Sequence, residues 1–481
     1  MTNNIIDNFA WKLLERFGAQ GVAFVVSIIL GRLLDPDTYG TVALVNVIIT
    51  VFSVFIDSGL GVALVQKKDA DDTDFSSVFY FNIIVCFVLY VVLFILSPLI
   101  SSFYKNEILT PIIRILGLSL IMSGFGSIQS AYISRNMMFK IFFKSTLYGT
   151  IISAIVGIFM AYNGYGVWSL VFQNVTNGLV NTIILWKNIK WRPKLLFSFS
   201  RLKTLLKYGS KLLASYLLDT IYQELNQLII GKKYSSSDLA FYNKGTNFPK
   251  VTTTSILASI DSTLLPVMSK EQDNIENIKN LTRKSIRIGS YVLWPMMIGL
   301  AACSDNLIRL LLTDKWAPAI PYLRIFCITY AFYPIHTSNL NAIKALGRSD
   351  LFLKLEIMKK VVGLTILLIS MRYGAYAMAL STIISSVISQ IINSWPNKEL
   401  MNYKYIDQLK DITPSLLLSV FMGIIVYCVN FINLNYLVTL IIQIMLGIII
   451  YIGLSYLLKF DSFLYCFNVL KNFINKKKKK Q

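Results

Sequence analysis

The sequence has few charged residues and almost no histidine. Asp, Glu, Lys and Arg make up 15% of its 481 residues, against about a quarter in soluble domains. The single histidine, His336, cannot build a multi-histidine metal site, and we expect it to be a hydrogen-bonded helix residue. No stretch has the composition of a soluble domain.

Cysteine and nucleotide-binding patterns are also missing. The five cysteines lie in apolar surroundings without the spacing of a metal or redox site, so we expect small buried hydrophobic side chains. No glycine-rich loop is followed by Lys-Ser/Thr, which argues against direct use of ATP. The N-terminus lacks a small-residue cleavage site, and we expect it to lead directly into a first membrane span. We expect no metal and no cofactor.

Long apolar runs are instead the main feature of the sequence. Hydrophobic residues make up 55% of the chain, the mean hydropathy is +0.59, and runs of about 20 apolar residues recur along its length. The sequence therefore predicts an all-α polytopic membrane protein with about 14 transmembrane helices. The expected spans are Ala10–Leu34, Tyr39–Val65, Ser77–Pro98, Thr110–Ile133, Ser145–Tyr162, Tyr165–Trp186, Tyr208–Tyr234, Leu239–Val267, Ile286–Ser304, Pro321–Ile343, Leu355–Met371, Tyr373–Trp395, Ile412–Phe431 and Tyr436–Leu458.

Basic residues are distributed unequally between the two sides of this topology. Roughly 34 of the 46 Lys and Arg residues fall on the side of the N-terminus, and positively charged loops stay in the cytoplasm. Both termini are therefore expected on the cytoplasmic side of the membrane, and the net charge of +21 needs no nucleic-acid partner. The linker 187–207 should lie at the membrane interface, with Trp191, Leu195, Leu196, Phe197 and Phe199 on lipid. The lysine-rich end favours a solvated, disordered tail near anionic lipid.

A short internal repeat divides the spans. Ile28–Val42 and Leu228–Tyr242 share a glycine (Gly31, Gly231), a following basic residue, and a small residue nine positions later, and the copies lie 200 residues apart. Because one copy ends span one and the other ends span seven, we expect two six-helix bundles related by a parallel repeat. The predicted domains are 1–186 and 208–395 for the bundles, 187–207 for the linker, 396–458 for spans thirteen and fourteen, and 459–481 for the tail.

Polar residues form stripes on the first two helices of each bundle, because residues three, four and seven positions apart share a helix face. Lys12, Arg16, Gln20 and Ser27 line up in span one. Each of the next three sets also shares a face: Asn46, Thr50, Ser53 and Asp57 in span two; Ser215, Asp219, Tyr222, Gln223 and Asn226 in span seven; Asn247, Lys250, Thr254 and Asp261 in span eight. Glu224 points away from the span-seven stripe.

Charged side chains are costly inside a bilayer, at about 2.5–3.5 kcal/mol each on an insertion scale. Four of them, Asp57, Asp219, Lys250 and Asp261, would together cost on the order of 10 kcal/mol if they faced lipid. We expect them to face each other or a water-filled cavity. Ion pairs that knit the helices together remain the structural alternative.

Four segments, "ILGRLLDPDTYG", "NFPKVTTTSILASIDSTLLPVMSKEQDN", "LIRLLLTDKWAPAIPYLRI" and "KALGRSDLFLK", resemble signatures of bacterial Wzx-type polysaccharide exporters. These are oligosaccharide-lipid flippases of the MOP superfamily, which also contains the MATE exporters. The resemblance covers nearly the full chain. It implies two bundles around a central cavity and export of an undecaprenyl-diphosphate-linked oligosaccharide, such as an O-antigen, capsule or exopolysaccharide unit, by a transporter that is not an enzyme.

The resemblance also implies roles for the polar stripes. Cations that meet the diphosphate are expected at Arg16, Lys211 and Lys250. Polar contacts to the glycan are expected from Asn46, Thr50, Ser53, Tyr222, Gln223, Asn226, Asn247 and Thr254. Asp57, Asp219, Glu224 and Asp261 would either neutralise the empty site or bind the coupling ion, H⁺ or Na⁺. Gln227 stands where related proteins often have Asp, a departure that bears on ion coupling. The expected partners are the lipid-linked glycan, the bilayer and other glycan-assembly membrane proteins, with no nucleic acid.

Two other functions stay open at this point. An ion-coupled, MATE-like exporter of small amphiphiles predicts a cavity dominated by acids, whereas acids and bases are mixed here. A membrane enzyme of glycan assembly could use the acid pairs of "KKDADDTD" (Lys67–Asp74) to hold a metal and a sugar nucleotide. Because that loop has no domain around it, helix-capping acids are the favoured interpretation.

Overall fold

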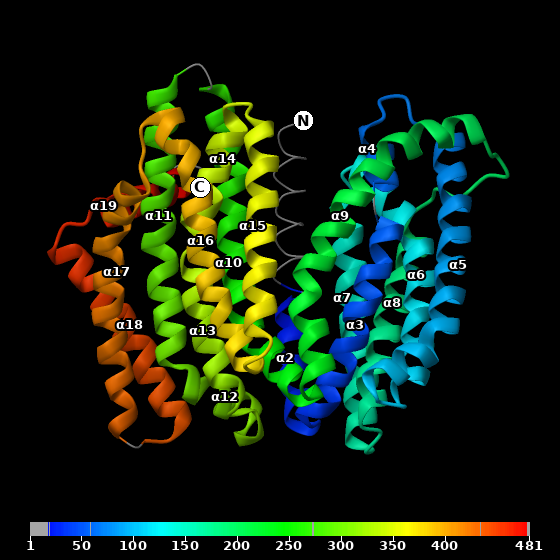
Figure 1. The fold of residues 1–481 in the computed structure, drawn as a ribbon, viewed down its shortest axis with the longest axis horizontal. Coiled ribbons are helices and arrows are strands. Elements are labelled where there is room, and N and C mark those ends of the chain that lie inside the picture. Colours follow the sequence, from blue (N-terminus) through cyan, green and yellow to red (C-terminus); the bar gives the residue numbers. More distant parts are fainter. Residues whose placement is uncertain (1–17, 19, 58, 272–273, 433, 479–481) are drawn as a thin grey trace. The chain divides into compact units, whose positions relative to one another are not determined.

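The computed structural model describes residues 18, 20–57, 59–271, 274–432 and 434–478. Every regular element among these residues is a helix, which confirms the predicted all-α class (Figure 1). Eight of the described helices are long and apolar enough to cross a membrane, so the chain is a multi-pass membrane protein. The number of fourteen spans stays a prediction. The chain separates into two compact units, the N unit (Met1–Ala240) and the C unit (Phe241–Gln481).

The N unit is a bundle in which α6 packs against α3, α4, α5, α7 and α8, while α9 packs against α3, α4 and α5. Helix α9 therefore belongs to the same compact unit as α3, although the predicted bundle boundary lies before it; the predicted domain ranges stay predictions. The helices are α2 (Gln20–Leu33), α3 (Pro36–Asp57), α4 (Leu60–Gln66), α5 (Asp72–Tyr104), α6 (Leu109–Arg135), α7 (Phe139–Tyr162), α8 (Val167–Asn188) and α9 (Phe199–Lys233).

The C unit is organised around α11, which packs against α13, α14 and α17. Helix α10 begins in the N unit and continues into the C unit. The helices are α10 (Ser236–Lys270), α11 (Ile275–Ala302), α12 (Ser304–Leu312), η2 (Asp314–Trp316), α13 (Ala319–Ala331), α14 (Tyr333–Ala345), α15 (Ser349–Ser370), α16 (Ala375–Met401), α17 (Tyr405–Cys428), η3 (Val429–Ile432), α18 (Tyr436–Leu457) and α19 (Asp461–Lys478).

Several predicted spans have different ends or breaks in the structure. The second span breaks between α3 and α4 beside Gly59, which has φ of +86°, a conformation that glycine adopts without strain. The tenth span is divided into α13 and α14 at Phe332.

The internal repeat is visible in the backbone. The amide of Leu34 donates to the carbonyl of Leu30 and the amide of Tyr234 to that of Ile230, both at 2.9 Å. Two more matching bonds start the next helices, Tyr39 to Asp35 at 3.3 Å and Leu239 to Ser235 at 3.2 Å. These bonds are offset by 200 residues, so the α2–α3 and α9–α10 turns are local copies of each other.

Glycines let these repeated segments approach each other closely. A Cβ atom added to Gly40 would lie 1.7 Å from the Ser236 carbonyl oxygen, so the start of α3 touches the start of α10 backbone to backbone. A Cβ on Gly59 would lie 2.7 Å from the Gly209 carbonyl oxygen, where the end of α3 meets α9. The α2–α3 and α9–α10 turns are therefore in contact within the N unit.

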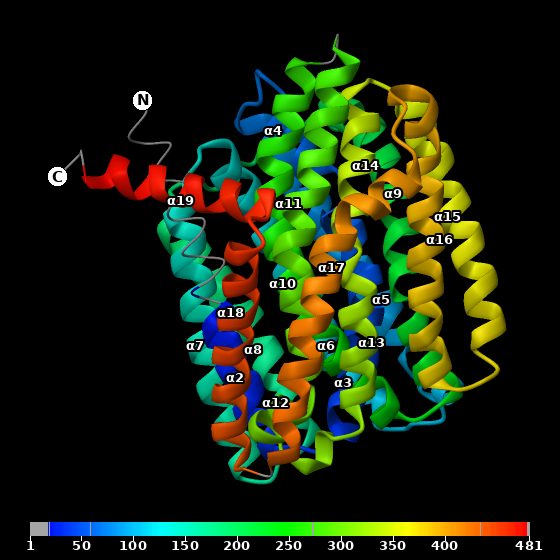
Figure 2. The ribbon, with the colours of Figure 1, turned by 90° about the vertical axis from the view of Figure 1, so that its left-hand side faces the viewer.

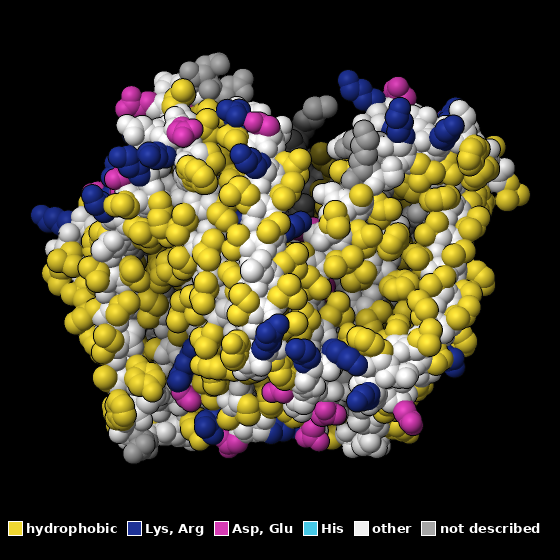
Figure 3. Space-filling model, viewed as in Figure 1, with side chains coloured by type: hydrophobic (Ala, Val, Ile, Leu, Met, Phe, Trp, Pro, Cys, Tyr) yellow, Lys and Arg dark blue, Asp and Glu magenta, His cyan; other side chains and the backbone are white. Residues whose placement is uncertain are grey.

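Hydrophobic side chains cover the middle of each unit's helices on the face drawn in Figure 3, and charged side chains gather toward the helix ends. One linker residue departs from its predicted position, because Trp191 is 8% exposed and packs in a buried cluster with Phe75 and Phe79. Leu195 is 96% exposed, as expected of a lipid-facing residue. The tail also differs from the disordered prediction, since Asp461–Lys478 forms α19, which runs across the direction of α18 (Figure 2).

Candidate functional site

The stripe predicted in the second span lies on one accessible face of α3. Asn46 and Thr50 are exposed and Ser53 is half-buried, whereas the neighbouring residue Val45 is buried. The Thr50 hydroxyl donates to the Asn46 carbonyl and the Ser53 hydroxyl to the Thr50 carbonyl, each at 2.8 Å. These local bonds satisfy the hydroxyl donors, while the Asn46 amide is at the surface of the helix.

Helix α9 contains two separate glutamine–acid pairs, the first within the predicted stripe. Gln223 is exposed and its amide donates to the Asp219 carboxylate at 2.8 Å, one turn earlier. The Gln227 amide donates to the Glu224 carboxylate, so the residue that departs from the family pattern is a hydrogen-bond partner of a neighbouring acid. Because α3 packs against α9, two of the predicted stripes lie on adjacent helices of the N unit. Tyr222, Asn226, Asp219 and Glu224 are all half-buried.

The third described stripe is on α10 in the C unit. Asn247, Lys250 and Thr254 are all exposed and occupy one face at positions i, i+3 and i+7. The Thr254 hydroxyl donates to the Val251 backbone carbonyl at 3.3 Å. The exposed Lys250 ammonium lies in the middle of a long helix. Because a cation facing acyl chains is costly, we expect it to contact water rather than lipid.

The remaining predicted site residues lie outside the residues and side chains that the structure describes. Arg16 and Lys12 precede the first described residue, and the side chains of Asp57, Lys211 and Asp261 are outside the described side chains. The roles predicted for all the stripe residues stay predictions.

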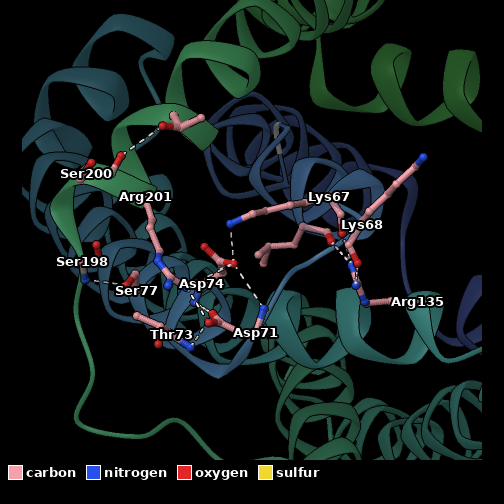
Figure 4. Close-up of polar contacts among 12 residues, drawn as sticks. Lys67, Lys68, Asp71, Thr73, Asp74, Ser77, Arg135, Ser198, Ser200 and Arg201 are labelled. Carbon is pink, nitrogen blue, oxygen red and sulfur yellow. Dashed lines mark hydrogen bonds and ion pairs between the residues drawn. The ribbon is translucent and has the colours of Figure 1, made fainter.

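The acidic loop Lys67–Asp74 is folded as a helix cap (Figure 4). The Asp71 carboxylate accepts from the backbone amides of Thr73 (3.1 Å) and Asp74 (3.0 Å), and the Asp74 carboxylate accepts from the Asp71 amide at 3.2 Å. This is a capping box at the start of α5, which confirms the predicted helix-capping interpretation. Among the described residues no group of three or more His, Cys, Asp and Glu side chains is placed to hold a metal.

The loop Lys67–Asp74 also forms ion pairs and a hydrogen bond with the linker 187–207. Arg201 of α9 pairs with the Asp71 carboxylate at 2.6 Å, and Lys194 pairs with Asp72 at 2.6 Å. The Trp191 indole also donates to Asp72 at 3.0 Å. The hydrogen bond from the Arg201 guanidinium is the main cause that lowers the pKa of Asp71 to about 2. We call these contacts the linker latch; sequence reasoning identified the linker and the acids separately but not their pairing.

Arg135 stabilises the other side of this loop. Its guanidinium donates to the carbonyls of Leu64 (2.8 Å), Lys67 (2.6 Å) and Lys68 (2.8 Å) (Figure 4). These three acceptors include carbonyls at the end of α4, where a cation complements the helix dipole. The loop between α4 and α5 is thereby fixed to the end of α6.

The C unit contains buried polar contacts that hold helices together. The His336 ring Nδ1 lies 2.8 Å from the Asn393 amide nitrogen, which confirms the prediction of a hydrogen-bonded helix histidine. Asn339 and Gln408 exchange two amide hydrogen bonds of 2.7 and 3.0 Å between α14 and α17. These groups are buried and paired, and their arrangement is that of a structural network.

Sequence reasoning missed a cavity inside the N unit of about 630 Å³. Its signal was present in α6, where serines recur at spacings of three and four residues: Ser119, Ser123, Ser127, Ser130 and Ser134. Recognising a cavity also required the positions of α7 and α8, which the spacing on α6 does not give.

The fold and these polar faces define a class of protein, a multi-pass helical membrane protein with polar faces on its helices. The structure matches that of the lipid II flippase MurJ in an inward closed conformation with a TM-score of 0.75 and 16% identity, covering 95% of this chain and 99% of that one. An inward-facing MATE family multidrug resistance transporter matches with a TM-score of 0.62 and 15% identity, covering 81% of this chain and 98% of that one. At these identities the likeness concerns the fold.

The sequence profile described as "Polysaccharide biosynthesis protein" matches residues 29–321. The chain belongs to this family, which confirms the resemblance found in the sequence. It is 24% identical over 388 residues to the teichuronic acid biosynthesis protein TuaB of Bacillus subtilis (strain 168), covering 79% of this chain and 80% of the relative. It is also similar to the succinoglycan biosynthesis transport protein ExoT of Rhizobium meliloti (strain 1021), at 23% over 344 residues, 71% of this chain and 69% of the relative. A third relative is the lipopolysaccharide biosynthesis protein WzxC of Escherichia coli (strain K12), at 22% over 395 residues, 81% of this chain and 79% of the relative.

Proposed function

We propose that this protein translocates an undecaprenyl-diphosphate-linked oligosaccharide across the bacterial cytoplasmic membrane. The observation that carries the proposal is the membership of the polysaccharide biosynthesis family, together with relatives in teichuronic acid, succinoglycan and lipopolysaccharide synthesis. One of these relatives is named a transport protein. A lipid II flippase shares the fold. These relatives favour a transporter over the membrane-enzyme alternative, as does the capping role of the acidic loop.

The proposed cycle is alternating access with both termini in the cytoplasm, an orientation supported by the bias of Lys and Arg toward that side. The anionic diphosphate is attracted by Arg16, Lys211 and Lys250. The exposed Lys250 on the polar face of α10 supports this role, since an ammonium forms strong charge-assisted bonds to phosphate oxygens. Amides on α3 and α9, including Asn46 and Gln223, contact the glycan.

Ion coupling is proposed for the carboxylates of the stripes. Asp219 and Glu224 each accept a hydrogen bond from a glutamine amide on α9, so each is a site where H⁺ or Na⁺ would exchange against an amide contact. Asp57 and Asp261 complete the proposed set. Other glycan-assembly proteins of the membrane are the proposed partners.

Deletion of the gene tests the proposed function. The expected result is lipid-linked oligosaccharide trapped in the inner leaflet and loss of the surface glycan. Normal surface glycan in a strain with no second exporter would contradict the proposal.

Lys250 is tested separately by complementation. Lys250→Ala should abolish export at normal expression, and Lys250→Arg should retain part of it because the positive charge remains. Lys270→Ala is the matched control, an exposed lysine at the end of the same helix. Equal export by the Lys250→Ala and Lys270→Ala proteins would remove Lys250 from the site.

The likeness of the fold to a MATE transporter supports a second candidate, an ion-coupled exporter of small amphiphiles. This function predicts that cells lacking the protein become sensitive to cationic drugs while their glycan stays normal. A drug-sensitive deletion strain with unaltered lipid-linked oligosaccharide would favour it over the flippase.

A further inference from the structure

The cavity of about 630 Å³ lies within the N unit, between α3, α4, α6, α7 and α8. Its volume is in the range of about 300–1,000 Å³ that is usual for small-molecule sites. The lining residues are Ile56, Gly61, Val62, Val65, Ser119, Met122, Ser123, Gly126, Ser127, Ser130, Ala131, Ser134, Phe142, Thr146, Gly178, Asn181, Thr182 and Leu185. We call it the hydroxyl pocket.

The lining is polar but carries no charge. Eight of these side chains are Ser, Thr or Asn, and none is Asp, Glu, Lys, Arg or His. Some are already used within the fold, since the Asn82 amide donates to the Ser127 hydroxyl at 3.1 Å. In the part of the chain that the structure describes, the side chains of Ser123, Ser130 and Asn181 form no hydrogen bond. Their donors and acceptors are available to a ligand.

The other residues that line the pocket are apolar or glycine. Phe142 supplies an aromatic ring, and Gly61, Gly126 and Gly178 add no side chains to the volume. A Cβ on Gly126 would meet no atom closer than the Thr182 hydroxyl at 3.7 Å, so this glycine is not required by packing. Its hydrogen atom in place of a methyl group keeps the pocket open.

The lining of the pocket suits one part of a lipid-linked glycan better than the others. A diphosphate would find no cation in the lining, and burying its charge without a partner is costly. A prenyl chain offers no hydrogen-bond partner to the available hydroxyl and amide groups, at a cost of about 1–3 kcal/mol for each group that it would bury. A sugar ring has hydroxyl edges for Ser123, Ser130 and Asn181 and a C–H face for Phe142.

We propose that the hydroxyl pocket holds a neutral sugar residue of the translocated glycan, an inference that rests on the proposed function. The pocket is a site for the sugar alone. The charged diphosphate is held elsewhere, at the cationic positions named above. The uncharged lining then selects glycans by the neutrality of the sugar that enters it.

Cysteine protection tests this inference in reconstituted full-length protein. Ser130→Cys is made after Cys428 and Cys466 are replaced by serine, because the other three cysteines are buried. Ser102→Cys, an exposed serine of α5 outside the pocket, is the matched control. Maleimide labelling is followed with four probes: lipid-linked oligosaccharide extracted from the source cells, the glycan released from it by mild acid, undecaprenyl phosphate and pyrophosphate.

The expected result is several-fold slower labelling of Ser130→Cys with the two glycan probes and no change with the other two. Protection by undecaprenyl phosphate or pyrophosphate, or equal protection of Ser102→Cys, overturns the inference. Absence of protection by any probe overturns it as well. Transport by the unsubstituted protein is measured in vesicles prepared in the same way. This measurement distinguishes failure of the pocket from failure of the proposed function.

A second variant measures the pocket through transport. Asn181→Leu keeps a similar volume and removes the amide, and it should slow translocation of the lipid-linked oligosaccharide several-fold. Leu179→Ala is the control, because Leu179 lies on α8 outside the pocket and is 45% exposed. Equal transport by the two variants counts against a sugar at Asn181.

Discussion

Gly40→Ala should weaken the contact between the two repeated turns. The added Cβ would lie 1.7 Å from the Ser236 carbonyl oxygen and 2.3 Å from its carbonyl carbon. Ordinary contact begins at 3.4 Å, so the backbone of the α9–α10 turn would have to retreat by 3.4 − 1.7 = 1.7 Å. Because the obstacle is backbone rather than a flexible side chain, no rotamer change relieves it.

Overpacking of a well-packed interior typically costs about 1–3 kcal/mol, and a backbone clash of this size belongs at the upper end of that range. The assay is thermal unfolding of the purified protein in detergent, followed by the loss of its helical circular dichroism signal. We expect a lower unfolding midpoint for Gly40→Ala.

Gly61→Ala is the matched control. A Cβ on Gly61 meets its nearest neighbour, the Ala131 methyl group, at 3.8 Å, and alanine favours the helix of α4 by up to about 1 kcal/mol over glycine. The control should therefore be at least as stable as the unsubstituted protein. Equal midpoints for the two variants would refute the close approach of the turns.

Two further predictions concern ion pairs at helix ends. Arg201→Ala should release the linker latch, measured as faster hydrogen exchange over residues 190–198, whereas Lys203→Ala on the same helix should leave the exchange unchanged. Because Arg201 depresses the pKa of Asp71 to about 2, the stability that this pair contributes is present above the usual pKa of about 3.9 and is lost as pH falls toward 2. The titration midpoint of the Asp71 carboxyl should rise from about 2 in Arg201→Ala, and an unmoved midpoint would contradict the pairing. Asp411→Asn should destabilise the C unit by about 1.5–3 kcal/mol, because its nearly buried carboxylate accepts from Arg283 at 2.8 Å and from the Tyr403 hydroxyl at 2.8 Å. The exposed Glu399→Gln is its control, and equal unfolding midpoints would show that the Asp411 contacts add little.

The stripes show what helical periodicity can predict from the sequence. The positions of Asn46, Thr50 and Ser53 on one accessible face of α3 follow from their spacing, as do those of Asn247 and Lys250 on α10. Helix geometry is a local property, so the sequence is sufficient for it. Their roles in binding depend on what those faces meet, which spacing does not contain.

The linker shows where composition misleads. Trp191 and Leu195 are both apolar residues in a basic segment, yet Trp191 is buried and Leu195 is almost fully exposed. Trp191 packs against Phe75 and Phe79 and donates to Asp72, and all three of these residues lie over 100 residues earlier in the chain. No pattern within the segment distinguishes the two side chains.

The sequence by itself determined the membrane class, the all-helical class and the repeated turn, because hydropathy, periodicity and glycine spacing are properties of neighbouring residues. Tertiary structure alone decided the burial of Trp191, the contact of Gly40 with Ser236 and the hydroxyl pocket. Each of these depends on segments distant in the chain whose approach is set by packing of whole helices. The serines of α6 are visible in the sequence, but the space in front of them exists only once α7 and α8 have packed beside it.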